Sequence, residues 1–206
     1  MFHPPLLRKL IMRDPSSRNS ALAEFQIQAI TLATIVGIMW GLEIIDVILF
    51  GNHLNQWGIH PRQLGGLMGI PLAPFLHGGF RHLIANTVPF VTLGWLVMLR
   101  RTEDFWWVTI ISVVVGGLGV WLFGGRGTVH IGASGVVFGY LGFLLLRGYF
   151  ERSAGSILFS LMIFVLYGGL VWGILPWQQR GISWEAHLFG FLGGVLAARL
   201  LARPVR

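Results

Sequence analysis

Apolar runs long enough to cross a lipid bilayer recur along the chain, and this feature limits the possible folds more than any other. A transmembrane helix needs about 20 mainly apolar residues. Runs of this kind lie at about 28–50, 80–99, 105–123, 156–175 and 184–201, with a shorter one at 134–146. No segment between them is long enough to build a core of its own. We therefore predict an all-α, polytopic membrane protein with a bundle of six transmembrane helices.

The composition agrees with a lipid surrounding. Charged residues make up only 11% of the 206 residues, whereas soluble domains carry about 25%. The net charge of +7 could suggest a nucleic-acid binder, but the basic residues lie at the ends of the apolar runs. That placement is typical of residues that set membrane orientation. We expect contact with the lipid bilayer and no nucleic-acid partner.

The distribution of basic residues predicts the topology. If the N-terminus is cytoplasmic, the inner segments hold eleven of the 15 Lys and Arg residues and the outer segments hold four. An inner excess of this kind is the usual pattern. The predicted organisation is a cytoplasmic N-terminal tail at 1–27, a membrane domain at 28–202 and a cytoplasmic C-terminal end at 203–206. The expected location is the cell membrane, and the second, fourth and sixth spans then run from outside to inside.

Four polar residues lie near the outer ends of those three spans. His82 and Asn86 are four residues apart and so share one face of the second span. Ser134 begins the fourth span after Gly132-Ala133, and His187 lies near the start of the sixth. The topology therefore predicts that these side chains meet at one depth, close to the outer face.

Taken singly, each of these residues has a simple structural interpretation. A serine after glycine and alanine often only packs, and His or Asn side chains can tie membrane helices together. Together, however, the four fit one chemistry. A serine nucleophile needs a base, which is most often histidine, and a developing oxyanion needs hydrogen-bond donors such as Asn, a second His and backbone N–H groups. We predict a Ser134–His187 dyad with His82 and Asn86 at the oxyanion.

No further catalytic group follows from the pattern. Glu185 is two residues from His187 and would point to a different side of a helix. Since the chain has no cysteine, disulfides, thiolate catalysis and Cys-ligated metals are excluded. There is also no His-Glu-x-x-His run and no cluster of carboxylates, so no metal or cofactor is expected.

Small residues predict close packing of the fourth and sixth spans. Gly190 and Gly194 form a small-xxx-small pair, which lets helix backbones approach each other in membranes. The fourth span offers a matching row of glycines at positions 135, 139 and 142. Close contact between these helices would bring Ser134 and His187 within reach of each other.

These residues carry a family resemblance. Gly132-Ala133-Ser134-Gly135, Ala186-His187 followed by glycines, and His82-x-x-x-Asn86 resemble the signature of the rhomboid intramembrane serine proteases over about residues 28–202. The resemblance implies a six-helix rhomboid-like bundle that cleaves transmembrane or juxtamembrane segments of other membrane proteins. It also implies that Ser134 is the nucleophile, His187 the base, and His82 and Asn86 the side chains of the oxyanion hole.

The chain departs from the family pattern at two places. Many bacterial members have a tyrosine four residues after the serine, where this chain has Phe138. Its ring can still stack under the base, but the hydroxyl is absent. The first long loop lacks the Trp-Arg pair of many members and reads Gly58-Ile59-His60-Pro61-Arg62. Neither departure affects the predicted dyad.

Two alternatives remain at this stage. One is a non-catalytic rhomboid-like protein that binds client transmembrane helices, in which Ser134 and His187 only pack. The other is a small transporter with a polar outer vestibule. Transport is disfavoured, because the sequence has no chain of intramembrane acids and no evident inverted repeat.

Overall fold

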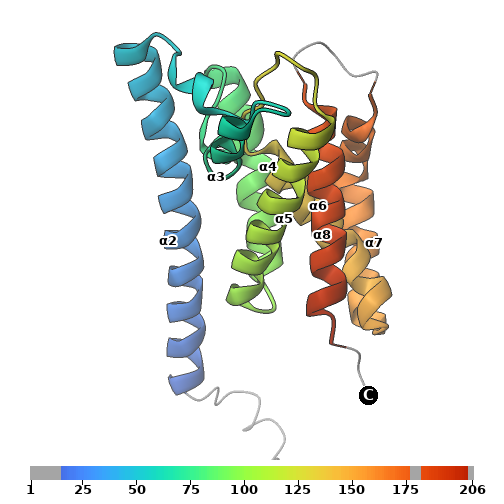
Figure 1. Cartoon of the computed structure of the whole chain (residues 1–206). Coiled ribbons are helices and arrows are strands. Elements are labelled where there is room, and N and C mark those ends of the chain that lie inside the picture. Colours follow the sequence, from blue (N-terminus) through green and yellow to red (C-terminus); the bar gives the residue numbers. More distant parts are fainter. Residues whose placement is uncertain (1–14, 177–181, 204–206) are drawn as a thin grey trace, which may run out of the picture.

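The structure, a computed structural model, describes residues 15–176 and 182–203. Long helices packed side by side make up most of it (Figure 1). These helices are α2 (Pro15–Ile45), α4 (Phe80–Met98), α5 (Thr102–Phe123), α6 (Ser134–Glu151), α7 (Ala154–Tyr167) and α8 (Trp184–Leu201). The described residues contain no β-strand, only an isolated backbone bridge between Ile59 and His130. The all-α prediction is therefore confirmed for this part of the chain.

Three segments are long and apolar enough to cross a membrane by length and composition, namely Ser20–Phe50, Thr102–Phe123 and Ala154–Ile174. The third carries large apolar side chains on its outer face, where Leu158, Val165 and Leu166 are 67%, 81% and 64% exposed. An apolar surface of this extent is unfavourable in water. It suits contact with lipid.

Helix α6 is longer than the sequence predicted, because a buried ion pair stabilises its last turn. The predicted end was near Leu146, but the helix continues to Glu151. Arg147 Nε lies 3.0 Å from Glu151 Oε1, and both side chains are almost fully buried. Glu151 also accepts hydrogen bonds from Arg100 and Ser156, both at 2.5 Å. The charged residues that would end an isolated apolar helix are here neutralised by partners on neighbouring segments.

The first and fifth predicted spans also differ from the helices observed. Helix α2 begins at Pro15, well before the predicted span, because residues 21–24 are strong helix formers. It continues as a π-helical turn at Asp46–Phe50. Helix α7 ends at Tyr167, and the glycine-rich segment Gly168–Ile174 forms a 3-10 helix (η5). The predicted bounds of the sixth span match α8.

The long first loop forms a compact layer at one end of the bundle, between α2 and α5 (Figure 1). It consists of 3-10 helices η2 (Leu54–Trp57), η3 (Leu64–Met68) and η4 (Ala73–Phe75) and a short helix α3 (Gly69–Leu72). The layer holds the loop at 124–133 in place. The backbones of Ile59 and His130 exchange two hydrogen bonds of 3.0 Å, and Gly132 N donates to Ala73 O at 2.8 Å.

The core lies where α4, α5 and α6 meet. Phe90, Phe105 and Tyr140 are almost fully buried, and their ring centroids lie 5.5–6.4 Å apart. The hydroxyl of Tyr140 lies 2.7 Å from Thr109 Oγ1, so the polar end of this large ring has a partner. This core sets the spacing of the helices whose ends carry the candidate site.

Candidate functional site

Ser134 is the first residue of α6, and the backbone before it has a conformation that favours glycine. Gly132 has a φ of +109°, where a side chain would be strained. A Cβ atom at this position would also lie 2.8 Å from His82 Cε1 and Nε2 and 3.3 Å from Asn86 Nδ2. Gly132 is therefore needed both for the turn and for the close approach of the loop to α4.

His187 lies in the first turn of α8 and is held from two sides. Its Nδ1 lies 2.9 Å from the carbonyl oxygen of Gly173. Its ring stacks on Phe138, with centroids 4.1 Å apart and the planes at 9°. The stacking that the sequence suggested for Phe138 is thus observed without the tyrosine hydroxyl.

The contact with Gly173 fixes the tautomer of His187. A backbone carbonyl can only accept, so Nδ1 carries the proton and donates. The neutral ring then has its lone pair on Nε2, which makes this nitrogen the proton acceptor. The sequence offered no third member for the dyad, and here a backbone carbonyl orients the imidazole. Gly173 itself has no room for a side chain, because a Cβ would lie 2.8 Å from Phe138 Cζ.

Glycines bring the backbones of α6 and α8 into direct contact. A Cβ at Gly190 would lie 2.0 Å from Gly135 O, and one at Gly194 would lie 1.8 Å from Gly139 O. Such distances leave no room for any side chain. This agrees with the close approach predicted from the small-residue pattern, and it brings the N-terminal ends of the two helices together.

His82 and Asn86 lie on α4, on the other side of Gly132. The Gly78 N–H donates to His82 Nδ1 at 3.2 Å, so the proton of a neutral His82 ring is on Nε2. Asn86 is 5% exposed, and its Nδ2 has no hydrogen-bond partner among the described residues. A buried donor without a partner costs about 1–3 kcal/mol. Two N–H donors therefore point at the space beside the Ser134 loop.

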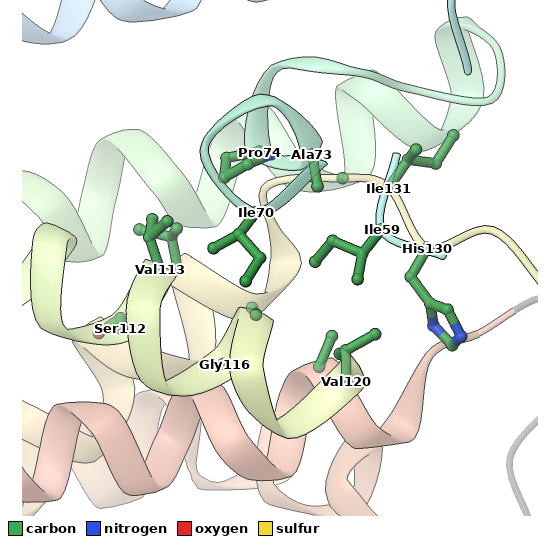
Figure 2. Close-up of a pocket in the computed structure, with 15 residues that line it drawn as sticks. Ile59, Ile70, Ala73, Pro74, Ser112, Val113, Gly116, Val120, His130 and Ile131 are labelled. Carbon is green, nitrogen blue, oxygen red and sulfur yellow. The ribbon is translucent and has the colours of Figure 1, made fainter. Parts of the chain in front are cut away.

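All four predicted site residues line one cavity of about 810 Å³. Its other walls come from the loop at 124–133 and from the segment Ile182–Glu185 at the start of α8. A smaller cavity of about 40 Å³ lies behind the loop (Figure 2), where Ile59, Ile70 and Val120 give it an apolar lining. The larger cavity therefore combines a hydroxyl, an imidazole with a free lone pair and two hydrogen-bond donors.

His77 is a buried aromatic ring beside His82. It is 1% exposed, and its ring centroid lies 5.2 Å from that of His82. Burial, and to a smaller extent the neighbouring His82, lowers the pKa of His77 to about 4. The ring is therefore uncharged at neutral pH. Sequence reasoning did not predict this ring contact, although the short spacing His77-x-x-x-x-His82 was visible.

The described residues include no group of three or more His, Cys, Asp or Glu side chains that could hold a metal ion. The chemistry that the site can perform on its own is proton transfer between a hydroxyl and an imidazole, next to donors for a negative oxygen.

The chain is similar to known proteins over most of its length. A family model described as "Rhomboid domain" matches residues 65–204. An uncharacterized protein of Mycobacterium tuberculosis is 40% identical over 201 residues, which covers 94% of this chain and 83% of the relative. A Bacillus subtilis protein, provisionally named a rhomboid protease, is 32% identical over 126 residues, or 61% and 62% of the two chains. RHOMBOID-like protein 5 of Arabidopsis thaliana is 34% identical over 144 residues, or 63% and 43%. The chain therefore belongs to the rhomboid family of membrane proteins.

Proposed function

We propose that this protein is an intramembrane serine endopeptidase that cleaves transmembrane or juxtamembrane segments of other membrane proteins. The observation that carries the proposal is the hydrogen bond between the His187 ring and a backbone carbonyl. The Nδ1–H of this ring is bound by the carbonyl of Gly173, which leaves Nε2 as a base beside the cavity that Ser134 also lines. The relative from Bacillus subtilis has "rhomboid protease" in its name, and this supports the same reaction.

In the proposed reaction, Ser134 Oγ attacks the carbonyl carbon of the scissile peptide bond while His187 Nε2 takes the hydroxyl proton. The oxyanion is held by Nε2–H of His82 and Nδ2–H of Asn86, and it gives Asn86 the partner that it otherwise lacks. The imidazolium then returns the proton to the leaving amine. A water molecule hydrolyses the acyl-enzyme in the same way and releases the second product.

The experiment for this proposal uses the full chain reconstituted in lipid vesicles with a purified single-span membrane protein. Cleavage products identified by mass spectrometry would support the endopeptidase. Stable association without products would instead support a non-catalytic rhomboid-like protein that binds client helices. A soluble, unfolded protein of equal concentration serves as the control for cleavage that does not depend on the membrane.

The oxyanion assignment predicts a graded loss of activity. Removing one donor typically lowers turnover by about 10²–10³-fold, so we expect this loss in Asn86→Ala and in His82→Ala. Thr87→Ala is the matched control, because Thr87 lies on the same helix but accepts a hydrogen bond from Trp40 on α2. Its turnover should stay close to that of the wild type. Full activity in both Asn86→Ala and His82→Ala would reassign these residues to helix packing.

We further propose that α2, α4, α5, α6, α7 with η5, and α8 are six membrane spans with both termini in the cytoplasm. The eleven-to-four distribution of basic residues supports this orientation. A reporter fused after Arg206 should then read cytoplasmic. One inserted at the exposed turn Gly51–Asn52 should read external. A C-terminal reporter on the outside would put the candidate site at the wrong face of the membrane.

A further inference from the structure

His130 connects the loop before Ser134 to the helix that carries His187. It is 9% exposed and lies in the loop at 124–133. Its Nδ1 lies 2.6 Å from Ser183 Oγ, and its Nε2 lies 2.7 Å from Thr128 Oγ1. In Figure 2 the ring points away from the small cavity, toward the chain segment that leads into α8. Neither residue pattern nor family resemblance predicted this contact.

The protons of this network can be assigned from the partners. The hydroxyl of Thr128 donates to Gly125 O at 2.6 Å, so its oxygen must accept from His130 Nε2–H. The other nitrogen of the neutral ring, Nδ1, then accepts from the hydroxyl of Ser183. The oxygen of Ser183 remains free to accept from the Ala186 N–H at 3.2 Å. The Ser183 hydroxyl has a second acceptor in Glu185 Oε2 at 3.5 Å, and its 2.6 Å contact with His130 Nδ1 is the shorter of the two.

The charge state of His130 fits this assignment. Burial lowers the pKa of His130, and the Glu185 carboxylate opposes this shift only in part. The Glu185 carboxylate is the charged group that raises the pKa of His130. Its Oε2 lies 3.5 Å from Ser183 Oγ. The imidazole is therefore neutral at physiological pH, and its Nδ1 can accept.

Ser183 is the N-cap of α8, four residues before His187. An N-cap hydroxyl accepts from the first turn and fixes where a helix starts. Because Ser183 is in turn bound by His130, the start of α8 is tied to the loop that leads through Gly132 to Ser134. The same loop is anchored to the first-loop layer by the backbone pair of His130 and Ile59.

We propose that His130 is a positioning residue that holds the N-terminus of α8, and with it His187, in register with the loop that carries Ser134. This inference rests on the proposed function for its effect on catalysis. The contact between His130 and Ser183, which we call the tether, can be measured separately. A displacement of about 1 Å in an active site can lower turnover by about 10²-fold. The tether therefore acts on kcat rather than on substrate affinity.

Two conservative variants separate the two contacts of the ring. In His130→Asn the amide oxygen takes the place of Nδ1 and can still accept from Ser183. In His130→Gln the amide reaches the place of Nε2 and can still donate to Thr128, but the contact with Ser183 is lost. We expect kcat to fall by about 10- to 100-fold in His130→Gln with KM little changed. His130→Asn should stay within a few-fold of the wild type.

The second readout does not depend on catalysis. Amide hydrogen exchange in the first turn of α8, at Ala186 and His187, should speed up in His130→Gln and not in His130→Asn. His53→Gln is the matched control, because His53 is exposed and its ring makes a hydrogen bond with the local carbonyl of Phe50. It should leave both kcat and exchange unchanged.

The outcomes distinguish this inference from the proposed function. Equal loss in His130→Asn and His130→Gln would mean that the ring only fills space, and wild-type behaviour of His130→Gln would mean that the tether has no effect. Either result overturns the inference. If the wild type cleaves nothing, the proposed function fails, and the exchange rates of the two variants still decide whether His130 holds the start of α8.

Discussion

Replacing Ser134 or His187 by alanine is expected to lower the turnover of a transmembrane substrate by roughly 10⁶-fold, as in serine proteases whose catalytic residues act as a unit. Without Ser134 there is no nucleophile. Without His187 the remaining imidazole among the four site residues is His82, and its Nδ1 is occupied by the Gly78 N–H. Initial rates in lipid vesicles, with products identified by mass spectrometry, measure the effect.

The double variant Ser134→Ala/His187→Ala should be no less active than either single variant, because the two residues share one step. Thermal unfolding in detergent provides the control for folding, and Ser134→Ala should unfold close to the wild-type temperature. Substantial turnover by folded Ser134→Ala would contradict the serine mechanism.

The second large effect concerns the contact between α6 and α8. In Gly194→Ala the new Cβ would lie 1.8 Å from Gly139 O, and in Gly190→Ala it would lie 2.0 Å from Gly135 O. The obstacle is backbone in both cases, so the helices must move apart. Overpacking of this kind typically costs about 1–3 kcal/mol of stability. The separation also moves His187 away from Ser134, so we expect little or no cleavage.

Gly37→Ala is the matched control for these variants. Gly37 lies inside α2, and a Cβ there would have no neighbour within 4 Å. Alanine is the better helix former by about 0.5–1 kcal/mol, so this variant should be at least as stable as the wild type. Unfolding midpoints and cleavage rates of the three variants provide the comparison. Wild-type stability of Gly194→Ala would show that α6 and α8 do not touch in the membrane.

The helices were predictable where local sequence decides their limits. The bounds of α8 follow from an apolar run that begins after Ser183, a good N-cap residue. The end of α6 was not predictable, because Arg147 and Glu151 look like the end of a span until Arg100 and Ser156 are placed beside them. After the early end of α7, the segment η5 places Gly173 against Phe138, and periodicity does not reveal this contact.

Part of the candidate site could also be predicted from the sequence, and part could not. Ser134, His187, His82 and Asn86 could be proposed from residue type and spacing, since membrane spans restrict where polar side chains occur. The partner of His187 is a backbone carbonyl, and every residue has one, so no sequence pattern marks Gly173. The contact of His130 with Ser183 joins residues 53 positions apart. Only the folded chain shows that their loops meet.

The most direct test of the account is the reaction of the purified protein with a serine-directed fluorophosphonate, followed by mapping of the modified residue. Attack by Ser134 Oγ on phosphorus releases fluoride and leaves a stable adduct. The account predicts one modified serine, Ser134, with labelling abolished in Ser134→Ala and strongly slowed in His187→Ala. An absence of labelling in folded wild-type protein, or an adduct on a different serine, would contradict it.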